Sequence, residues 1–336
     1  MTSPVNVRYL SGFTGGDGTL LLRRDGATLL SDGRFTLQIE EECSELNDVY
    51  IRSGNETMAT AVAHVFGKSK SGRLGVEAES LTLAESERLA EKLPKTTIVP
   101  TKDVVETFRQ IKDKSEIDAI RKAIDVAAAA FADSRLILHR DHTEIEFRNE
   151  IEYRMRLHGA EDKSFSTIIA AGPRAALPHA VPTSQRIDGQ PMLLVDWGAA
   201  VNGYMSDLTR VIVFSPTKKL RTVYETVLKA QLAAIAAIKP GKTGAEIDAV
   251  ARNVIKDAGF GKHFNHGLGH SIGLQVHESP RLRCDHSTVL KPGMVLTVEP
   301  GIYLKDWGGV RIEDDVLVTK TGCEVLSRQV PKHFGS

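Results

Sequence analysis

One pattern recurs in the second part of this chain at an interval of one hundred residues. Residues 143–159 begin with the Thr-x-x-Glu spacing of a helix capping box and end on glycine, and residues 243–259 do the same. Such a repeat constrains the fold strongly, because each copy needs the same helix in the same structural position. We therefore expect two related α/β halves, with a chance recurrence of common capping residues as the alternative.

A long helix is expected before each of these segments. The first is predicted to begin at Ser115, with Asp118 three residues later. The second is predicted to have Ser215 as its N-cap and Pro216 at its first position. Each half would thus consist of two helices followed by strands.

The strands of each half carry two acidic residues. These are Asp196 and Asp207 in the first half, and Glu299 and Glu313 in the second. The arrangement predicts that both halves supply carboxylates to one site between them. For the last residue the alternative is a simple salt bridge with Arg311 on the face of an ordinary strand.

A hairpin is predicted around the first acidic pair. Asn202-Gly203 is the preferred two-residue hairpin turn, and apolar segments flank it. This turn places Asp207 opposite Gly198, with Asp196 as its diagonal neighbour on the same face. Like charges at this range raise one another's pKa unless a cation lies between them. The alternative is a surface hairpin with solvated acids, but Asp196 lies in an otherwise apolar segment.

Histidines are concentrated just before the second acidic pair. Four of them lie within fifteen positions, namely His263, His266, His270 and His277. The spacing of His266 and His270 would place both on one face of a helix. Because Gly267 and Gly269 disfavour a helix there, we expect a tight loop or strand that brings imidazoles to a pocket. Chance clustering of histidines is the alternative.

The acids and one of these histidines form a candidate ligand set for metal. Its five members are Asp196, Asp207, His270, Glu299 and Glu313. Four carboxylates and one imidazole are the ligands expected of two divalent ions that share a water. The sequence therefore predicts a metallohydrolase.

Composition excludes several other classes. The chain has 336 residues, with 43 basic and 43 acidic side chains, so its zero formal charge gives no reason to expect nucleic acid or an anionic membrane as partner. No apolar run approaches the roughly 18 residues of a membrane span, and the first residues lack a secretory signal pattern. The three cysteines are scattered without a CxxC motif. We expect a cytoplasmic protein.

The length indicates about two domains. Residues 19–22 and 27–30 are predicted to form a hairpin in an N-terminal part of short strands and turns. Long, well-capped helices begin near residue 110. We expect an α/β (α+β) fold with domains at residues 1–110 and 111–336.

Taken together, these sequence motifs resemble those of the M24 or pita-bread metallopeptidases and, among them, those of the Xaa-Pro peptidases prolidase and aminopeptidase P. Residues 8–15 (RYLSGFTG) and 31–35 (SDGRF) are similar to the creatinase-type N-terminal domain of that family. The resemblance implies a catalytic domain of two related halves, preceded by a smaller creatinase-type α/β domain. That N-terminal domain usually opens with a further helix and strand before the phrase at residues 6–9, so we expect a truncated or trimmed start.

The resemblance also implies roles for individual residues. Two divalent ions, most simply Mn²⁺ with Co²⁺ or Zn²⁺ as alternatives, would be bridged by Asp207 and Glu313. Asp196 would bind one ion, and His270 with Glu299 the other. The residues implied in catalysis are Glu299, His179 and His277. Those implied in contacting substrate or orienting ligands are His266, Tyr303 and Arg311.

The implied reaction is hydrolysis of Xaa-Pro peptide bonds by a hydroxide that the two ions share, in an enzyme expected to be a homodimer. Compact size favours a prolidase that acts on dipeptides, and aminopeptidase P, which accepts longer peptides, is the alternative. Methionine aminopeptidase shares the five ligands but lacks the N-terminal domain, and creatinase lacks the full ligand set. A remote alternative is an inactive pita-bread module that binds another protein.

Overall fold

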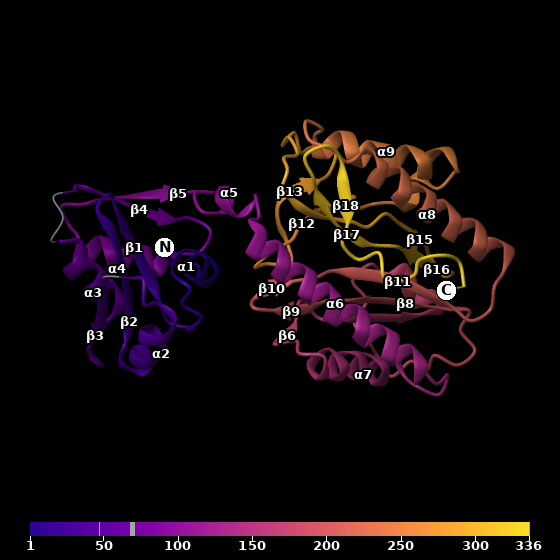
Figure 1. The fold of residues 1–336 in the computed structure, drawn as a ribbon, viewed down its shortest axis with the longest axis horizontal. Coiled ribbons are helices and arrows are strands. Elements are labelled where there is room, and N and C mark those ends of the chain that lie inside the picture. The colour runs from indigo at the N-terminus through magenta and orange to yellow at the C-terminus, as the bar shows by residue number, and fades with distance from the viewer. Residues whose placement is uncertain (47, 68–70, 336) are drawn as a thin grey trace. The chain divides into compact units, whose positions relative to one another are not determined.

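The computed structural model describes residues 1–46, 48–67 and 71–335. The chain forms two compact units, Met1–Arg109 and Gln110–Ser336 (Figure 1). Within the described residues, no helix is both long and apolar enough to cross a membrane.

The first unit alternates short strands and helices. In chain order its elements are α1 (Pro4–Ser11), β1 (Thr19–Arg23), β2 (Gly26–Asp32), the 3₁₀ turn η1 (Gly33–Phe35), α2 (Thr36–Glu42), β3 (Val49–Arg52), α3 (Met58–Phe66), β4 (Arg73–Glu77), α4 (Leu83–Lys92), β5 (Thr97–Thr101) and α5 (Glu106–Arg109). Strands β1, β2 and β3 form one sheet, and β4 pairs with β5 in another. The predicted hairpin is confirmed, because β1 and β2 are antiparallel and their last pair is Arg23 with Gly26.

The second unit contains the two predicted halves. The first half consists of α6 (Lys114–Leu136), α7 (Glu144–Leu157), β6 (Asp162–Lys163), β7 (Ile168–Ala171), η2 (Gly172–Ala176), β8 (Met192–Trp197), β9 (Ala199–Val201), β10 (Tyr204–Met205) and β11 (Leu208–Val213). The second half consists of α8 (Lys218–Ala237), α9 (Gly244–Asp257), η3 (Gly261–His263), β12 (Gly269–Ser271), β13 (Glu278–Leu282), β14 (Val295–Val298), β15 (Gly301–Leu304), β16 (Gly308–Arg311), β17 (Asp314–Val318) and β18 (Cys323–Val325).

The one-hundred-residue repeat is confirmed in the second helix of each half. Thr143 caps α7 and Thr243 caps α9, each through a complete capping box. Each helix is followed by a glycine in the left-handed region, Gly159 with φ 99° and Gly259 with φ 85°. Both helices therefore begin and end by the same local chemistry.

The predicted starts of the two long helices are wrong by two residues. The N-cap of α6 is Asp113, whose carboxylate accepts from the Glu116 N–H, and the Ser115 hydroxyl donates to that same carboxylate. The N-cap of α8 is Thr217. Ser215 lies in a bend where its N–H donates to the Pro191 carbonyl, and the helix begins only after Thr217.

The sheets of the two halves follow the same plan. Strands β7, β8 and β11 are adjacent in one sheet, and β12, β14 and β17 are adjacent in the other in the equivalent order. A hairpin, β9 with β10, connects β8 to β11, just as β15 with β16 connects β14 to β17. Figure 1 shows helices α6 and α7 beside the first set of strands and α8 and α9 beside the second.

The predicted register of the first hairpin is confirmed. Trp197 pairs with Leu208 and Asp196 with Thr209, which is the register expected from a two-residue Asn202-Gly203 turn. Both turn residues have positive φ, as a type I′ turn requires.

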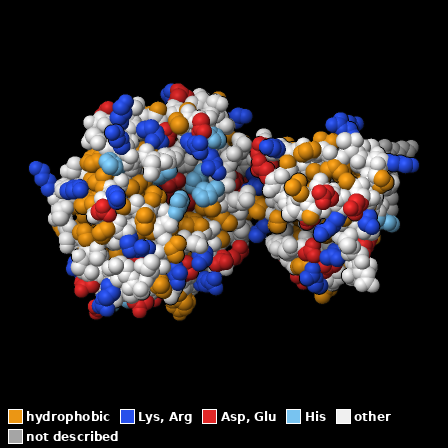
Figure 2. All heavy atoms as spheres, turned by 180° about the vertical axis from the view of Figure 1, so that it is seen from behind, with side chains coloured by type: hydrophobic (Ala, Val, Ile, Leu, Met, Phe, Trp, Pro, Cys, Tyr) orange, Lys and Arg blue, Asp and Glu red, His pale blue; other side chains and the backbone are white. Residues whose placement is uncertain are grey.

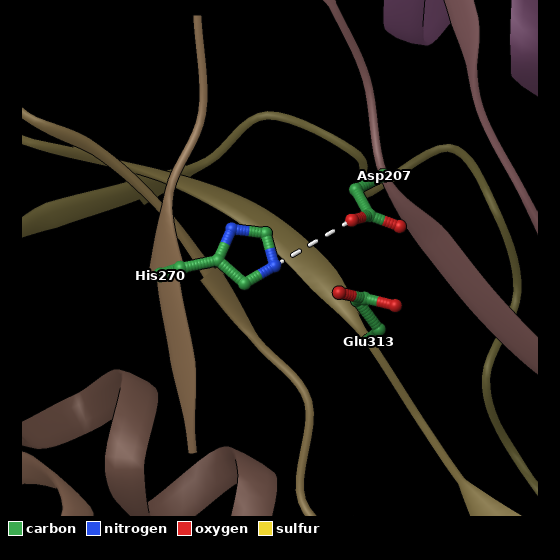
Figure 3. Close-up of side chains that lie close together, drawn as sticks. All are labelled: Asp207, His270 and Glu313. Carbon is green, nitrogen blue, oxygen red and sulfur yellow. Dashed lines mark ion pairs between the residues drawn. The ribbon is translucent and has the colours of Figure 1, made fainter. Parts of the chain in front are cut away.

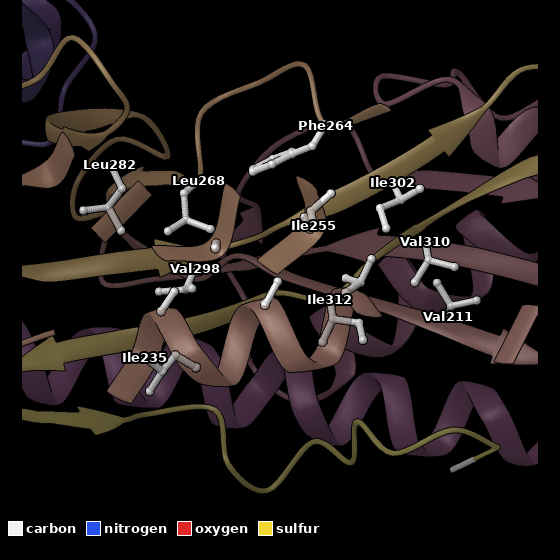
Figure 4. Close-up of a cluster of buried hydrophobic side chains, with 14 of the residues drawn as sticks. Val211, Ile235, Ile255, Phe264, Leu268, Leu282, Val298, Ile302, Val310 and Ile312 are labelled. Atoms are coloured by element: carbon white, nitrogen blue, oxygen red, sulfur yellow. The ribbon is translucent and has the colours of Figure 1, made fainter. Parts of the chain in front are cut away.

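Apolar packing holds these strands in place. A buried cluster joins helices α8 and α9 to strands of both halves, and Figure 4 shows Ile235, Ile255, Val298 and Ile312 among its members. On β8, the Trp197 ring stacks on Phe131 of α6 with a centroid separation of 4.2 Å, and its N–H donates to a carbonyl of the same helix. The strand ends beside this cluster are thereby fixed.

Candidate metal centre

The repeated strands end at the same place and bring acidic side chains together. Asp196 lies near the end of β8, and Glu299 directly follows the equivalent strand β14. Asp207 directly precedes β11, and Glu313 directly precedes β17. The two halves are linked here, because the Glu313 N–H donates to the Thr209 carbonyl on β11.

His270 on β12 completes this group. The ligand atoms of Asp207, His270 and Glu313 all lie within 4.8 Å of one another, and all three residues are buried (Figure 3). The His270 Nε2 atom lies 3.7 Å from Asp207 Oδ2 and 3.5 Å from Glu299 Oε1. His270 lies on a strand and His266 in a bend just before it, which agrees with the tight loop or strand predicted from the glycines.

The tautomer of His270 suits a metal ligand. Its Nδ1 atom lies 3.1 Å from the Ser271 carbonyl, which can only accept, so Nδ1 carries the proton. Nε2 then presents a lone pair to the acidic group. Burial lowers the pKa of His270 to about 3, so the ring is neutral near pH 7 and can bind a metal ion.

The buried acids repel one another, and a bound cation would relieve this repulsion. Burial and then the charge of Glu313 raise the pKa of Asp207 and of Glu299 well above the ordinary range. Burial and then the charge of Asp196 raise the pKa of Glu313 to about 8. Because a cation between carboxylates favours their charged forms, this centre is electrostatically matched to bound metal.

An unpartnered oxygen points to the same conclusion. Asp196 Oδ1 is buried and has no hydrogen-bond partner among the residues that the structure describes. Arg311 pairs with Asp196, and the four carboxylates, when all are ionised, would carry about three more negative charges than this guanidinium balances. Hard divalent ions prefer such oxygen-rich sites, so the residues present fit a metal centre.

Arg311 is hydrogen-bonded to Asp196 directly and to Glu313 through Thr209. Its Nη2 atom donates to Asp196 Oδ2 at 2.5 Å, and its Nε atom donates to the Thr209 hydroxyl at 3.1 Å. The Thr209 hydroxyl in turn donates to Glu313 Oε2 at 2.6 Å. Since Arg311 is only 3% exposed, its contacts favour the orienting role over contact with substrate.

A second chain of hydrogen bonds leads from Arg311 to His266. The Arg311 Nη1 atom donates to the Tyr303 hydroxyl at 2.8 Å, and that hydroxyl lies 3.0 Å from His266 Nε2. His266 Nδ1 lies 2.8 Å from the Gly267 carbonyl, so the proton of the ring is on Nδ1 and Nε2 accepts from tyrosine. Burial lowers the pKa of His266 to about 4, which keeps this ring neutral.

His179 and His277 are exposed at the mouth of this site. The His277 ring packs edge-on against His270 with centroids 4.4 Å apart. His179 lies close enough to Asp196, His266 and His277 to interact electrostatically with all three. In Figure 2, histidine side chains surround acidic side chains in a hollow on one face of the second unit.

The sequence reasoning missed Thr209 and Asp315. Asp315 accepts a hydrogen bond from the Asp207 N–H at 3.1 Å and is fully buried. Thr209 could have been found from strand periodicity, because residues two apart on a strand share a face with Asp207. No sequence signal marks Asp315, since its contact depends on strands more than one hundred residues apart.

Comparisons with known proteins agree with this geometry. The profile of metallopeptidase family M24 matches residues 118–320, and that of the creatinase/prolidase N-terminal domain matches residues 1–111. The chain is 40% identical over 330 residues to the Xaa-Pro dipeptidase of Pyrococcus furiosus, which covers 98% of this chain and 92% of that protein.

Two solved structures are similarly close. The Xaa-Pro dipeptidase from Bacillus anthracis has a TM-score of 0.94 and 39% identity, covering 98% of this chain and 92% of that one. The X-Pro aminopeptidase from Thermotoga maritima has a TM-score of 0.92 and 34% identity, covering 99% of this chain and 94% of that one.

Two related α/β halves that converge on an acidic centre define a metallopeptidase of the pita-bread type. The chain belongs to metallopeptidase family M24 and carries the creatinase/prolidase N-terminal domain. The resemblance inferred from the sequence, the fold class and the enzyme class are confirmed.

Proposed function

We propose that this protein hydrolyses Xaa-Pro peptide bonds and that it is an Xaa-Pro dipeptidase. The observation that carries the proposal is the buried cluster of Asp207, His270 and Glu313, with Glu299 and Asp196 beside it, in a chain 40% identical to an Xaa-Pro dipeptidase over nearly its whole length. Residues 111–336 are the proposed catalytic domain, and residues 1–110 the N-terminal domain. We also propose a homodimer, which sedimentation analysis tests.

The proposed centre holds two divalent ions, with Mn²⁺ as the first candidate and Co²⁺ or Zn²⁺ as alternatives. The family resemblance implies that Asp207 and Glu313 would be shared by both ions, and both carboxylates lie in the clustered group. Asp196 would hold one ion, and His270 with Glu299 the other. When bound, such ions polarise a carbonyl and lower the pKa of a water.

The protein's own groups have distinct proposed tasks. Glu299 has a side chain that is 18% exposed, so its carboxylate can hold the proton of the attacking water and deliver it to the leaving imino nitrogen. Partial burial lowers the pKa of His277, so this ring stays neutral and can donate an N–H to the carbonyl oxygen of the substrate. His179 is the second proposed donor.

His266, Tyr303 and Arg311 form the proposed positioning group. Their hydrogen-bonded chain connects Asp196 to a half-buried imidazole beside Glu299, with His266 Nδ1 4.0 Å from Glu299 Oε2. His266 is the member that can also contact substrate, because the other two are buried.

Aminopeptidase P activity is the second candidate, and the similarity to the Thermotoga maritima X-Pro aminopeptidase favours it. The two activities differ in how much space lies beyond the proline. Hydrolysis of an Xaa-Pro dipeptide should therefore be compared with that of an Xaa-Pro-Yaa-Zaa tetrapeptide, with an Xaa-Ala dipeptide as control. We expect the Xaa-Pro dipeptide to be preferred. Preference for the tetrapeptide would assign the second activity, and preference for the alanine peptide would reject both.

A further inference from the structure

His179 reaches the mouth of the acidic centre on a segment that leaves strand β7 and returns to helix α7. The segment, residues 172–183, begins with η2, and at its other end the Thr183 carbonyl accepts from the Ile145 N–H at 3.2 Å. The His179 side chain is exposed. Because an exposed ring has little packing to hold it, its position depends on how firmly the backbone of this segment is held.

One buried carboxylate binds both ends of the segment. Glu144, the first residue of α7, is 0% exposed. Its Oε1 atom accepts from the Ala171 N–H at 2.9 Å, directly before the segment begins. Its Oε2 atom accepts from the Thr183 N–H at 2.9 Å and from the Thr183 hydroxyl at 2.8 Å. A single side chain therefore closes the two ends onto each other.

Arg174 extends this contact into the middle of the segment. Its Nε atom lies 3.0 Å from each carboxylate oxygen of Glu144, and its Nη2 atom donates to the Val181 carbonyl at 2.6 Å. Val181 lies two residues after His179. Since hydrogen bonds between charged groups are stronger than neutral ones, this ion pair stabilises the turn that carries the imidazole.

The beginning of the segment also packs against the second half. A Cβ atom at Gly309 on β16 would lie 2.1 Å from the Ala175 carbonyl oxygen, so glycine is required for this close approach. Ala175 itself is fully buried. Residues 172–176 are thus fixed by packing, whereas the exposed part with His179 depends on Glu144 and Arg174.

The second half uses a similar arrangement for His266. Asp248 on α9, the helix equivalent to α7, is 1% exposed and accepts from the Leu268 N–H at 3.1 Å. Its carboxylate also accepts from Arg252, whose guanidinium donates to the Phe264 and His266 carbonyls at 2.9 Å. Because burying a charged pair is costly, its recurrence at both histidine segments indicates a task besides stability.

We propose that Glu144, acting through Arg174, is a positioning residue for His179. Asp248 has the same task for His266. The first role rests on the proposed function, in which His179 donates to the carbonyl oxygen of the substrate. Such donors are effective only when they are aimed at the developing charge before the reaction begins. The buried carboxylate provides this aim by holding the backbone on both sides of the imidazole.

Glu144→Gln should lower kcat for an Xaa-Pro dipeptide by about 10–100-fold, with KM and metal content little changed. The reason is that an oxyanion donor contributes about 10²–10³ in kcat, and a misplaced donor loses part of this contribution. Glu152→Gln is the matched control, because Glu152 lies on the same helix and pairs with Lys163. This control should keep the kcat of the parent.

The decisive measurement is made in a chain that already lacks the imidazole. In the His179→Ala background, Glu144→Gln should cause no further loss of kcat, because Glu144 acts through His179. Arg174→Met should give the same result, and its partly exposed side chain (28%) makes it the second variant should Glu144→Gln fail to fold. Losses that multiply in the double variants would overturn the proposal.

Amide exchange in the metal-free protein tests the same contacts without any peptide. We expect the Ala171 and Thr183 amides to exchange about tenfold faster or more in Glu144→Gln than in the parent, and unchanged exchange would overturn the proposal. An inactive parent would refute the proposed function and this role with it, whereas an active parent with multiplying losses would refute only the positioning role. Asp248→Asn, compared with His266→Ala in the same way, tests the second half.

Discussion

At the scale of single residues, the acidic centre depends on groups that hold the candidate ligands as much as on the ligands themselves. Thr209 is the clearest case. Its hydroxyl accepts from Arg311 and donates to Glu313, so one side chain links the guanidinium to a proposed bridging carboxylate. Partners of this kind orient ligands and tune their affinity for metal.

Removing a proposed bridging carboxylate should abolish both metal uptake and hydrolysis. We expect this for Asp207→Ala and for Glu313→Ala, because each loss removes a ligand central to the group. Metal content by mass spectrometry and hydrolysis of an Xaa-Pro dipeptide are the measurements. Glu324→Ala is the control, since Glu324 pairs with Arg121 away from this centre. Full metal content in either variant would refute the ligand assignment.

Thr209→Val should lower the affinity for metal by about 10–100-fold while the protein stays folded. The cause is the loss of the hydrogen bond that orients Glu313. A competitive chelator titration measures the affinity. Thr209→Ser retains the hydroxyl and should restore most of it. If the valine variant bound metal as tightly as the parent, Thr209 would have no positioning role.

The stabilisation of the protein by metal should increase from pH 6 to pH 8. In the metal-free protein the pKa of Glu313 is raised to about 8, so this residue contributes stability below its unfolded-state pKa and loses it as the pH rises toward 8. Bound cations remove that loss, and fewer protons compete with them at higher pH. Melting temperatures with and without Mn²⁺ across this range test the prediction. A shift that does not depend on pH would contradict it.

At the scale of secondary-structure elements, the two halves use equivalent helix starts to place their strands. Thr143 and Thr243 each cap a helix and also form an isolated bridge to a later segment, with Arg186 and Val289 respectively. In each half, one threonine therefore fixes both the start of the helix and the position of the later segment that pairs with it.

Thr243→Ala should lower the free energy of unfolding by about 1 kcal/mol, because the N-cap hydrogen bond to Glu246 is lost. Thr143→Ala should cost a similar amount, since the cap is the same. Urea denaturation measures both changes. Thr222→Ala, which removes an exposed hydroxyl within helix α8, is the control and should change little. Unequal effects of the two cap variants would show that the halves are not energetically equivalent.

At the scale of the whole molecule, a buried ion pair next to the acidic centre links the two halves of the second unit. Arg210 on β11 donates to Asp314 on β17 at 2.8 Å, and both side chains are buried. Asp314 also accepts from Gln231 and pairs with Lys332. The connection reaches from the first half through the second to the C-terminal segment.

Arg210→Met should destabilise the protein by about 3–5 kcal/mol, because it leaves Asp314 with less compensation in a buried position. Denaturant unfolding of the metal-free protein measures this without reference to activity. The double variant with Asp314→Leu should recover part of the loss, since the fully buried carboxylate is then absent and only the partly exposed Lys332 loses an ion-pair partner. Additive losses in the double variant would show that the pair is not coupled.

Much of the fold follows from short-range signals in the sequence. The capping boxes of α7 and α9 and the register of the Asn202-Gly203 hairpin depend on residues within a few positions of one another. The predicted starts of α6 and α8 were wrong because several capping residues compete there. Tertiary contacts, such as that of Ser215 with Pro191, select among them.

The sequence by itself determined the repeated halves and the family, and it predicted the candidate ligand set, since these depend on residue types at characteristic spacings. Only the tertiary structure decided how the ligands are held. The contacts of Thr209, Arg210 and Asp315 join segments about one hundred residues apart. The spacing of residues along a chain predicts local hydrogen bonds. Burial and cross-strand contacts arise only when distant segments pack together.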